Sequence, residues 1–144
     1  MNREIKFRGK RKKDGLWIYG SMCLQEDLLF GDETVCIYPS GAYDSYDNYV
    51  VDKCTVGQYT GLKDKNGVEI YEGDIIKSNA STGKPIYHDI FYNEEQAAFY
   101  AGLDGKRDAS FGISSVHQRW INEFGKEVVG NIHDNPELLT KEER

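Results

Sequence analysis

The sequence predicts a mainly β (α+β) fold, with an antiparallel barrel-like core and one short covering helix. Its 144 residues include ten Tyr, six Phe and two Trp, and aromatic side chains suit the half-buried surface of a sheet. Short segments with alternating apolar side chains are separated by Asp-Gly and Asn-Gly pairs, which favour hairpin turns. A chain of this length suits one domain, so we expect a single domain over residues 1–144.

The first strands are predicted from alternation and turn residues. Residues 4–12 alternate apolar and charged side chains, which predicts a strand with one apolar face. The Asp-Gly pair at 14–15 predicts a turn, and the continuously apolar residues 16–19 predict a return strand covered on both faces. A further strand is expected over residues 34–38, followed by a polar loop over residues 39–48.

The centre of the chain carries the strongest turn signal. The Asn-Gly pair at 66–67 predicts a type I′ turn between strands at 56–62 and 68–71. The Gly-Asp pair at 73–74 predicts a tight corner that leads into a strand over 74–79 and could close a small barrel. An Asp after such a glycine caps backbone amides, so we expect a structural role for its carboxylate.

The covering helix is expected near the C-terminal end. Residues 114–124 place apolar side chains at helical spacing, with Ser114 or Ser115 as the cap and Gly125 as the left-handed end. The Asn-Pro pair at 135–136 predicts a terminal helical turn that the asparagine caps. The remaining strands are expected over residues 86–92, 96–101 and 127–132.

Positive charge is concentrated at the start of the chain. The net charge is −6, yet residues 1–13 carry seven Lys or Arg and one Glu, so the rest of the chain has a net charge of −12. Such asymmetry can attract a polyanion or bring two copies together head to tail. The candidate surface for nucleic acid or a partner consists of Arg3, Lys6, Arg8, Lys10, Arg11, Lys12, Lys13 and Trp17.

Two alternatives stay open for this basic hairpin. Its cations could follow phosphates while Trp17 and Tyr19 stack on bases. Alternatively, Trp17 belongs to the core and the cations form an ordinary solvated surface. The acidity of the rest of the chain opposes tight binding to a polyanion.

A second candidate surface is the polar loop. Tyr43, Tyr46 and Tyr49 alternate there with Asp, Ser and Asn, a mixture that is favoured in surfaces that bind proteins. The alternative is an ordinary exposed loop.

The sequence contains no recognisable catalytic or metal-binding pattern. The three His have no metal-like spacing, and the three Cys form no Cys-x-x-Cys pair. Glu69, Glu72 and Asp74 are close in sequence, and Asp134 could approach them; paired carboxylates can bind a divalent ion or carry out acid–base chemistry. Their positions at a corner and on an alternating strand favour structural roles. We therefore expect no enzyme, no cofactor and no metal.

The chain lacks the marks of export or membrane insertion. No secretory segment opens it, and no apolar run approaches the ~20 residues of a membrane span. We therefore expect a cytoplasmic protein with reduced thiols and no membrane partner.

Three blocks of the sequence resemble the YopX family of phage and prophage proteins. They are Arg3-Glu-Ile-Lys-Phe-Arg8, residues 56–76 with their Gly-Gln-Tyr-Thr-Gly-Leu-Lys-Asp-Lys-Asn-Gly run, and Val129-Gly-Asn-Ile-His-Asp-Asn-Pro-Glu-Leu-Leu139. Where many members continue Phe-Arg with Ala-Trp-Asp, this chain has Gly-Lys-Arg, which enlarges the basic cluster. The blocks span nearly the whole chain.

The resemblance implies a mainly β fold with an SH3-like barrel portion and an origin in a temperate phage. It implies no established activity and no catalytic residues. The resulting expectation is a non-catalytic accessory protein in the cytoplasm of the bacterial host. We expect it to bind an unknown phage or host protein, or a second copy of itself; the alternative is a nucleic-acid-binding module that uses the basic N-terminal hairpin.

Overall fold

The computed structural model describes residues 1–26, 31–108 and 114–140. Within the chain, contacts divide the residues into two compact units, 1–59 and 60–144.

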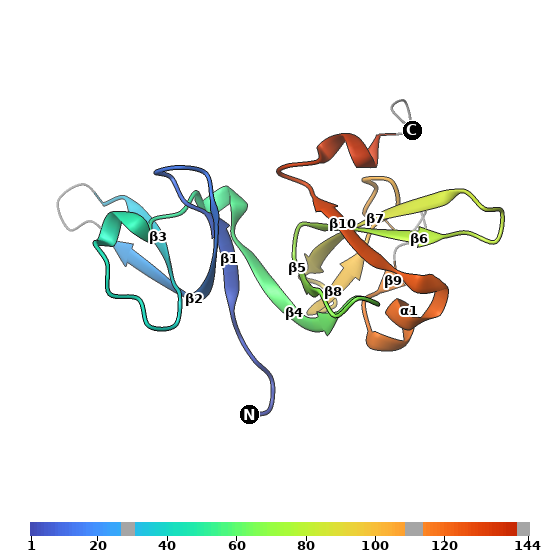
Figure 1. Cartoon of the computed structure of the whole chain (residues 1–144), viewed down its shortest axis with the longest axis horizontal. Coiled ribbons are helices and arrows are strands. Elements are labelled where there is room, and N and C mark those ends of the chain that lie inside the picture. Colours follow the sequence, from blue (N-terminus) through green and yellow to red (C-terminus); the bar gives the residue numbers. More distant parts are fainter. Residues whose placement is uncertain (27–30, 109–113, 141–144) are drawn as a thin grey trace. The chain divides into compact units, whose positions relative to one another are not determined.

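The first unit is built from short antiparallel strands (Figure 1). Its elements are β1 (Phe7–Lys10), β2 (Trp17–Glu26), β3 (Glu33–Tyr38), two 3-10 helices (Tyr46–Asn48 and Lys53–Thr55) and the start of β4 (Gly57–Lys63). The strand order is β3-β2-β1-β4, and β4 continues into the second unit, where it pairs with β5 (Glu69–Tyr71).

The second unit adds a five-stranded antiparallel sheet in the order β10-β6-β7-β8-β9. Its strands are β6 (Asp74–Asn79), β7 (Pro85–Asn93), β8 (Ala98–Ala101), β9 (Ser114–Ser115) and β10 (Glu127–Asn131). Helix α1 (Gln118–Asn122) is followed by 3-10 turns at Glu123–Gly125 and Pro136–Leu139. In the described ranges, no helix has the length and apolar character needed to cross a bilayer.

The mainly β fold is confirmed, but the closed barrel is not formed. In the described part of the chain both sheets are open, with β3 and β5 at the edges of one and β10 and β9 at the edges of the other. β2 changes partner along its length: residues 17–20 pair with β1 and residues 21–26 pair with β3. The change occurs at Gly20, where an added Cβ would lie 2.0 Å from the Tyr38 carbonyl oxygen.

The core of the first unit lies on one face of its strands. Val35, Ile37 and Val51 are buried there, and Phe7, Ile18 and Val56 pack against them. The expectation that residues 16–19 are covered on both faces is wrong, because Leu16 is 58% exposed and Tyr19 is 46% exposed. In this region β2 is therefore covered on one face only.

The core of the second unit joins the sheet to the helix. Its buried members are Ile70, Ile76, Ile90, Ala101 and Ile121. Ile121 comes from α1, so the short helix covers this sheet as expected.

The turn at 64–68 is held by a buried carboxylate. Asp64 is 6% exposed, and its Oδ1 accepts the N–H groups of Asn66 (2.8 Å) and Val68 (2.9 Å). Its Oδ2 accepts the N–H of Val128 in β10 at 2.9 Å. Gly67 has a φ of 81°, whereas Asn66 has no positive φ, so the hairpin is confirmed but the type I′ assignment is wrong. Asp64 selects a turn in which only the glycine is left-handed.

The corner at Gly73 is confirmed. Gly73 has a φ of 84°, its N–H donates to the Ile90 carbonyl at 2.8 Å, and its carbonyl accepts the Ile132 N–H at 2.8 Å. Asp74 is 1% exposed, and its Oδ2 accepts the Tyr71 N–H at 2.8 Å. The carboxylate caps a backbone amide, as the sequence predicted.

The helix expected over residues 114–124 is shorter. Ser114 and Ser115 form β9 and pair with β8, so neither serine caps the helix. His117 is the cap instead, because its Nδ1 accepts the Trp120 N–H at 3.1 Å. Strand pairing overrides helical periodicity here, while Gly125 takes the expected left-handed φ of 57°.

The terminal helical turn is confirmed, but its cap is not. Asn135 makes no side-chain cap bond to the 3-10 turn Pro136–Leu139. Its Oδ1 instead accepts the Asn131 N–H at 3.3 Å, so the asparagine holds the end of β10.

Candidate protein-binding surface

The basic residues of β1 lie on a face that also carries aromatic rings. The guanidinium of Arg8 lies 4.7 Å from the centre of the Trp17 ring, and Lys10 Nζ lies 5.5 Å from it. Arg8 is only 6% exposed and Trp17 is half-buried. Because cations over an aromatic face are held by its electrostatic attraction, these two cations contribute to the cover of Trp17.

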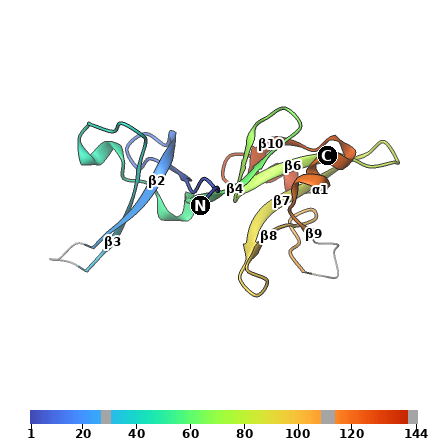
Figure 2. The same ribbon diagram turned by 90° about the horizontal axis from the view of Figure 1, so that it is seen from below.

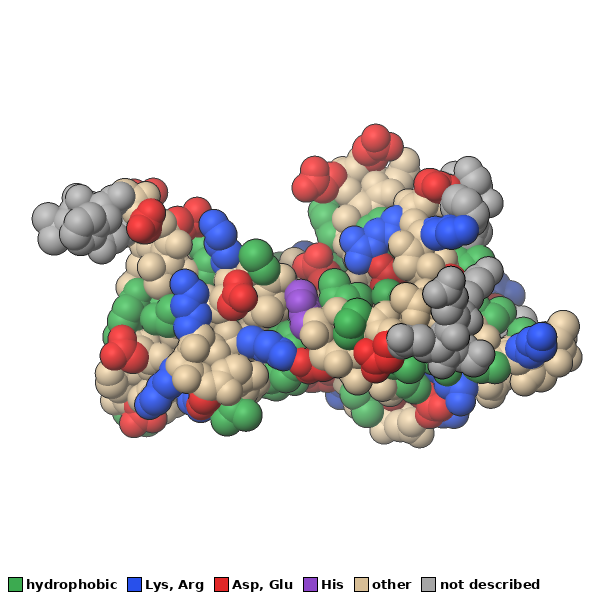
Figure 3. Space-filling view, turned by 90° about the horizontal axis from the view of Figure 1, so that it is seen from above, with side chains coloured by type: hydrophobic (Ala, Val, Ile, Leu, Met, Phe, Trp, Pro, Cys, Tyr) green, Lys and Arg blue, Asp and Glu red, His purple; other side chains and the backbone are tan. Residues whose placement is uncertain are grey.

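The other predicted cations differ in their surroundings. Lys6 Nζ lies 5.0 Å from the centre of the Tyr59 ring and 3.2 Å from a Glu4 carboxylate oxygen. Arg3 and Lys12 are exposed. On the face shown in Figure 3, positive and negative side chains are interspersed rather than gathered into one patch of a single sign.

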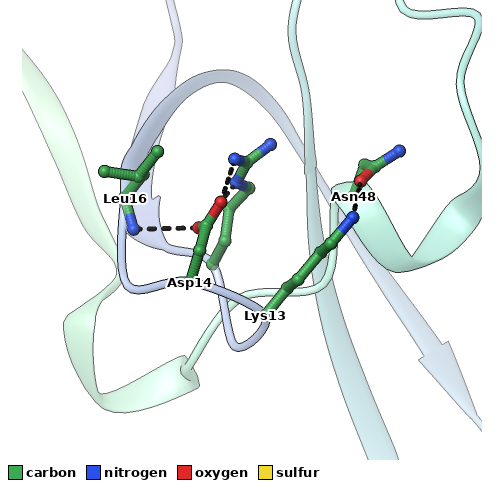
Figure 4. A network of polar contacts seen from close by, with 5 residues as sticks. Lys13, Asp14, Leu16 and Asn48 are labelled. Atoms are coloured by element: carbon green, nitrogen blue, oxygen red, sulfur yellow. Dashed lines mark hydrogen bonds and ion pairs between the residues drawn. The ribbon is translucent and has the colours of Figure 1, made fainter.

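The turn after β1 is confirmed and is stabilised by side chains (Figure 4). Arg11 forms an ion pair with Asp14, whose Oδ1 accepts the Leu16 N–H at 3.1 Å. The hydrogen bond between the two side chains lowers the pKa of Asp14 and raises the pKa of Arg11. Lys13 Nζ donates to Asn48 Oδ1 at 3.0 Å, so the basic turn contacts the polar loop.

The three predicted tyrosines of that loop have different roles. Tyr43 is 95% exposed and Tyr46 is 42% exposed, whereas Tyr49 is 7% exposed. The Tyr49 hydroxyl accepts the Asp44 N–H at 2.8 Å, and its ring lies 4.9 Å from that of Tyr38. Tyr49 therefore anchors the loop and leaves the other two rings at the surface. Desolvation raises the pKa of Tyr46, and the nearby Cys36 thiol raises it further, so its phenol is neutral at neutral pH.

The turn and the loop together line two shallow hollows. One, of about 510 Å³, is lined by Lys12, Lys13, Ser45, Asp47, Asn48 and Val50. The other, of about 350 Å³, is lined by Arg11, Ile18, Asn48, Tyr49 and residues 39–44. We call residues 11–13 together with residues 43–48 the turn–loop surface. The structure thus joins parts of two surfaces that the sequence suggested separately.

The sequence did not identify the residue that joins them. Asn48 lines both hollows and accepts the hydrogen bond from Lys13. The two residues lie 35 positions apart, so no local spacing could indicate their contact. Residues Arg8 and Lys10, in contrast, belong to the Trp17 face and do not line these two hollows.

The predicted carboxylates have structural partners. Asp74 holds the Tyr71 amide, Glu69 accepts the Tyr71 hydroxyl at 3.1 Å, and Asp134 accepts an Asn131 amide hydrogen at 3.0 Å. Among the residues that the structure describes, no group of three or more His, Cys, Asp or Glu side chains is arranged to hold a metal ion.

A half-buried histidine lies in the second unit. His88 Nε2 lies 3.0 Å from Ser78 Oγ, and its Nδ1 lies 2.9 Å from the Gly102 carbonyl oxygen. Its ring meets that of Trp120 edge-on at 5.3 Å. Burial lowers the pKa of His88, and burial also lowers the pKa of Lys126. Ser78 is 5% exposed, and these contacts link His88 of β7 to β6 and to the backbone at Gly102.

Comparisons with known proteins agree with the fold. The model of the YopX protein family matches residues 6–140. A crystal structure of protein EF1440 from Enterococcus faecalis is similar over 96% of this chain and 100% of its own, with 28% identity and a TM-score of 0.55. Protein yopX from Bacillus subtilis is similar over 96% of this chain and 97% of its own, with 18% identity and a TM-score of 0.51. No curated protein matches the sequence.

Proposed function

This chain belongs to the YopX family, and we propose that it is a non-catalytic accessory protein of a temperate phage or prophage that binds another protein. The partner is a phage or host protein in the cytoplasm of the bacterial host. The observation that carries the proposal is the turn–loop surface, where the exposed ring of Tyr43 lines one hollow, Lys12 and Lys13 line the other, and Asn48 lines both.

The anchoring of the loop supports this role. Buried Tyr49 accepts the Asp44 N–H, and Asn48 accepts a hydrogen bond from Lys13, so both ends of the tyrosine segment are held before any partner arrives. A loop that is already ordered loses less conformational entropy on binding. Tyrosine also supplies a large amphipathic contact with only two side-chain torsions to fix.

The charges of the surface favour a protein over a polyanion. Lys12 and Lys13 line the same hollow as Asp47, and protein interfaces commonly surround an apolar centre with a mixed polar rim. An SH3-like arrangement of the strands, which the family resemblance implies, belongs to this proposal, because such small β folds present loops for binding.

The hydrogen bonds that the buried acidic residues accept support a non-catalytic role. Asp64 and Asp74 are buried, and both accept backbone amides. A carboxylate engaged in this way stabilises its own turn and is a poor general base, because its lone pairs already accept hydrogen bonds.

A tagged-protein capture from phage-carrying cells tests the proposal. Wild-type protein is compared with a Tyr43→Ala, Lys12→Glu double variant and with Tyr92→Ala, a control that removes a ring 43% exposed in the second unit. We expect a stoichiometric partner that the double variant loses and the control retains. Recovery of the same partner by all three proteins would overturn the assignment of the surface.

Nucleic acid is the second candidate, and one observation favours it. Cations lie over aromatic rings in the first unit, with Lys10 over the half-buried Trp17 of β2 and Lys6 over Tyr59 of β4, a combination also found in grooves that bind single strands. Because Arg8 is buried, its reversal would disturb the fold, so Arg3→Glu with Lys12→Glu is the appropriate variant. Gel shifts at ~50 mM salt that show no binding by the wild type would exclude this candidate, whereas steep salt dependence would support it.

A further inference from the structure

The outer half of β2 is a strand with one unused edge. Residues 21–26 pair with β3, but β1 stops pairing with β2 at Gly20, and residues 1–6 form no strand. Figure 2 shows this β2–β3 ribbon extending from the rest of the first unit. All six residues from Ser21 to Glu26 are exposed.

Hydrogen bonds on the far side of β3 show which groups of β2 point to the open edge. The Ile37 N–H donates to the Tyr49 carbonyl at 2.9 Å, and the Val35 carbonyl accepts the Val51 N–H at 3.0 Å. Both groups therefore point away from β2. In an antiparallel pair, opposite residues share this direction, and Met22 lies opposite Ile37 while Leu24 lies opposite Val35.

It follows that Met22 and Leu24 direct their backbone N–H and C=O groups away from β3. By the two-residue period of a strand, Glu26 does the same. Three residues thus present six backbone hydrogen-bonding groups along the open edge. Such an edge is a template for another strand.

The side chains do not protect this edge. Natural edge strands are commonly guarded by charged side chains, above all Lys, by Pro or by a bulge; residues 21–26 contain no Lys and no Pro, and their one charged residue, Glu26, lies at the outer end. Met22 is 37% exposed and Leu24 is 54% exposed, and both lie on one face of the ribbon.

We propose that a second copy of this chain pairs antiparallel along this edge, with Leu24 opposite Leu24 of the second copy. This register is the one that pairs all three outward residues. Met22 then lies opposite Glu26 of the second copy, and Glu26 lies opposite Met22 of the second copy. The four side chains of Met22 and Leu24 from the two copies form one apolar cluster, and the sheet continues from β3 through both β2 strands.

Charge supports a second copy as the occupant. The outer end of the ribbon carries Glu26, Asp32 and Glu33. Its inner end borders a hollow of about 550 Å³ lined by Glu4, Ile5, Lys6 and residues 19–21 and 38–40, and Arg3 adjoins this segment in the sequence. Antiparallel pairing brings the acidic end of each ribbon to the more basic end of the other, so both ends of a two-fold contact attract.

The contact is small, and small protein interfaces are weak or transient. We therefore expect the dimer to have a dissociation constant of about 10–100 µM. Sedimentation of the full chain should give a mass near 16.4 kDa when dilute and approach twice that value when concentrated.

Charge substitutions test the register. Leu24→Lys places two like charges opposite each other in the dimer, and we expect it to weaken association at least tenfold. Gln25→Lys adds the same charge on the other face, opposite Cys23 of the second copy, and should change association much less. Unchanged tryptophan fluorescence would show that both variants remain folded; equal dimerisation by Leu24→Lys and wild type would overturn the proposal.

A cross-link tests it independently. In a background without the two exposed thiols (Cys23→Ser, Cys54→Ser), Leu24→Cys should place the two new thiols with Cα atoms about 5.5 Å apart, within disulfide range. Ser21→Cys is the matched control, since its thiols would lie six residues out of register, roughly 20 Å apart. With copper phenanthroline as oxidant, we expect a covalent dimer from Leu24→Cys alone. Equal cross-linking of both variants, or of neither, would contradict the pairing.

This inference is separate from the turn–loop surface. Neither Met22 nor Leu24 lines the hollows of that surface. Loss of self-association by Leu24→Lys with retained capture of a partner protein would show that the two sites act independently.

Discussion

The two units each have a turn with a left-handed glycine and an aspartate that accepts a backbone amide two residues later. Asp14 directly precedes its glycine, whereas Asp64 begins its turn three residues before Gly67. Asp14 is at the surface and pairs with Arg11, whereas Asp64 is 6% exposed and also holds Val128 from another strand. The sequence predicts a turn in both cases. Burial decides whether the carboxylate forms bonds only within its own turn or also holds a strand that is distant in the sequence.

Cations over tryptophan show the same difference. In the first unit, Lys10 Nζ lies 5.5 Å from the centre of Trp17 and the lysine is partly exposed. In the second unit, Lys126 Nζ lies 4.3 Å from the centre of Trp120, donates to the Glu123 carbonyl at 3.1 Å, and belongs to a residue only 3% exposed. We infer that the second unit is mainly a scaffold and that the first unit presents the binding surfaces.

The largest effect is expected at Asp64. Asp64→Ala leaves three backbone amides from two segments without their acceptor, and each such bond to a charged group is worth about 1.5–3 kcal/mol. Because water can replace part of this loss, we expect a free energy of unfolding lower by about 4 kcal/mol. Urea unfolding followed by Trp120 fluorescence measures it.

Asp64→Asn is the matched control, since it keeps one oxygen acceptor and the same size. We expect its effect to lie between those of the wild type and Asp64→Ala. An alanine variant as stable as the wild type would show that Asp64 does not hold the two segments together.

A substitution in the second core should have the next largest effect. Ile90 is fully buried, and Ile→Ala changes of this kind cost about 3 kcal/mol. The chain has one Trp in each unit, Trp17 and Trp120, so variants that retain only one of them report on one unit. We expect Ile90→Ala to shift the unfolding seen by Trp120 and to leave that seen by Trp17 nearly unchanged.

This measurement also tests the prediction that residues 1–144 form a single domain. Equal shifts of the unfolding midpoint at Trp17 and Trp120 would mean that the two compact units unfold together as one cooperative domain. Separate shifts would mean that each core is stable on its own.

A smaller effect is expected from pH. Burial lowers the pKa of His88 in the folded protein, so the unfolded chain binds a proton more readily, near pH 6.5. The stability that this histidine contributes is complete above pH 6.5 and is lost as the pH falls below it, by at most about 1.4 kcal/mol per pH unit. Unfolding measured from pH 7.5 to 5 with Trp120 as the probe should show the loss.

His88→Gln removes this titration while His117 and His133 remain. We expect its stability to depend less on pH over the same range. A wild-type protein that becomes more stable as the pH falls from 7 to 5.5 would contradict the lowered pKa of His88 in the folded protein.

The smallest effect is expected at Asp14. Asp14→Ala removes an exposed ion pair and one amide acceptor in a turn that also has backbone hydrogen bonds between Arg11 and Leu16 and between Gly15 and Arg11. Exposed pairs contribute little, so the urea midpoint should be close to that of the wild type. A loss as large as that of Asp64→Ala would remove the distinction between the two turns.

Much of the fold was predictable from local pattern, because turns and alternation are encoded within a few residues. β6 has the expected bounds of 74–79, and the corner at Gly73 and the turn at Gly15 are confirmed. The predictions that failed depended on distant partners. Ser114 and Ser115 pair with β8, and Asp64 bonds to β10, so local helical period and the Asn-Gly pair gave the wrong details.

The candidate site was predictable only in parts. The composition of the loop indicated its tyrosines, and the charge indicated the basic turn. Their meeting through Lys13 and Asn48 is a tertiary contact across 35 positions. Which tyrosine is buried also depends on the fold, since Tyr49 packs on Tyr38 while Tyr43 faces solvent.

Site-specific photo-cross-linking in phage-carrying cells tests the division of roles most directly. A photoreactive phenylalanine replaces Tyr43 in one protein and Tyr92 in the other, so that each unit carries the probe at an exposed ring. We predict a discrete cross-linked partner from position 43 and none from position 92. A partner cross-linked from position 92 alone would contradict the account, because it would place the binding surface on the second unit.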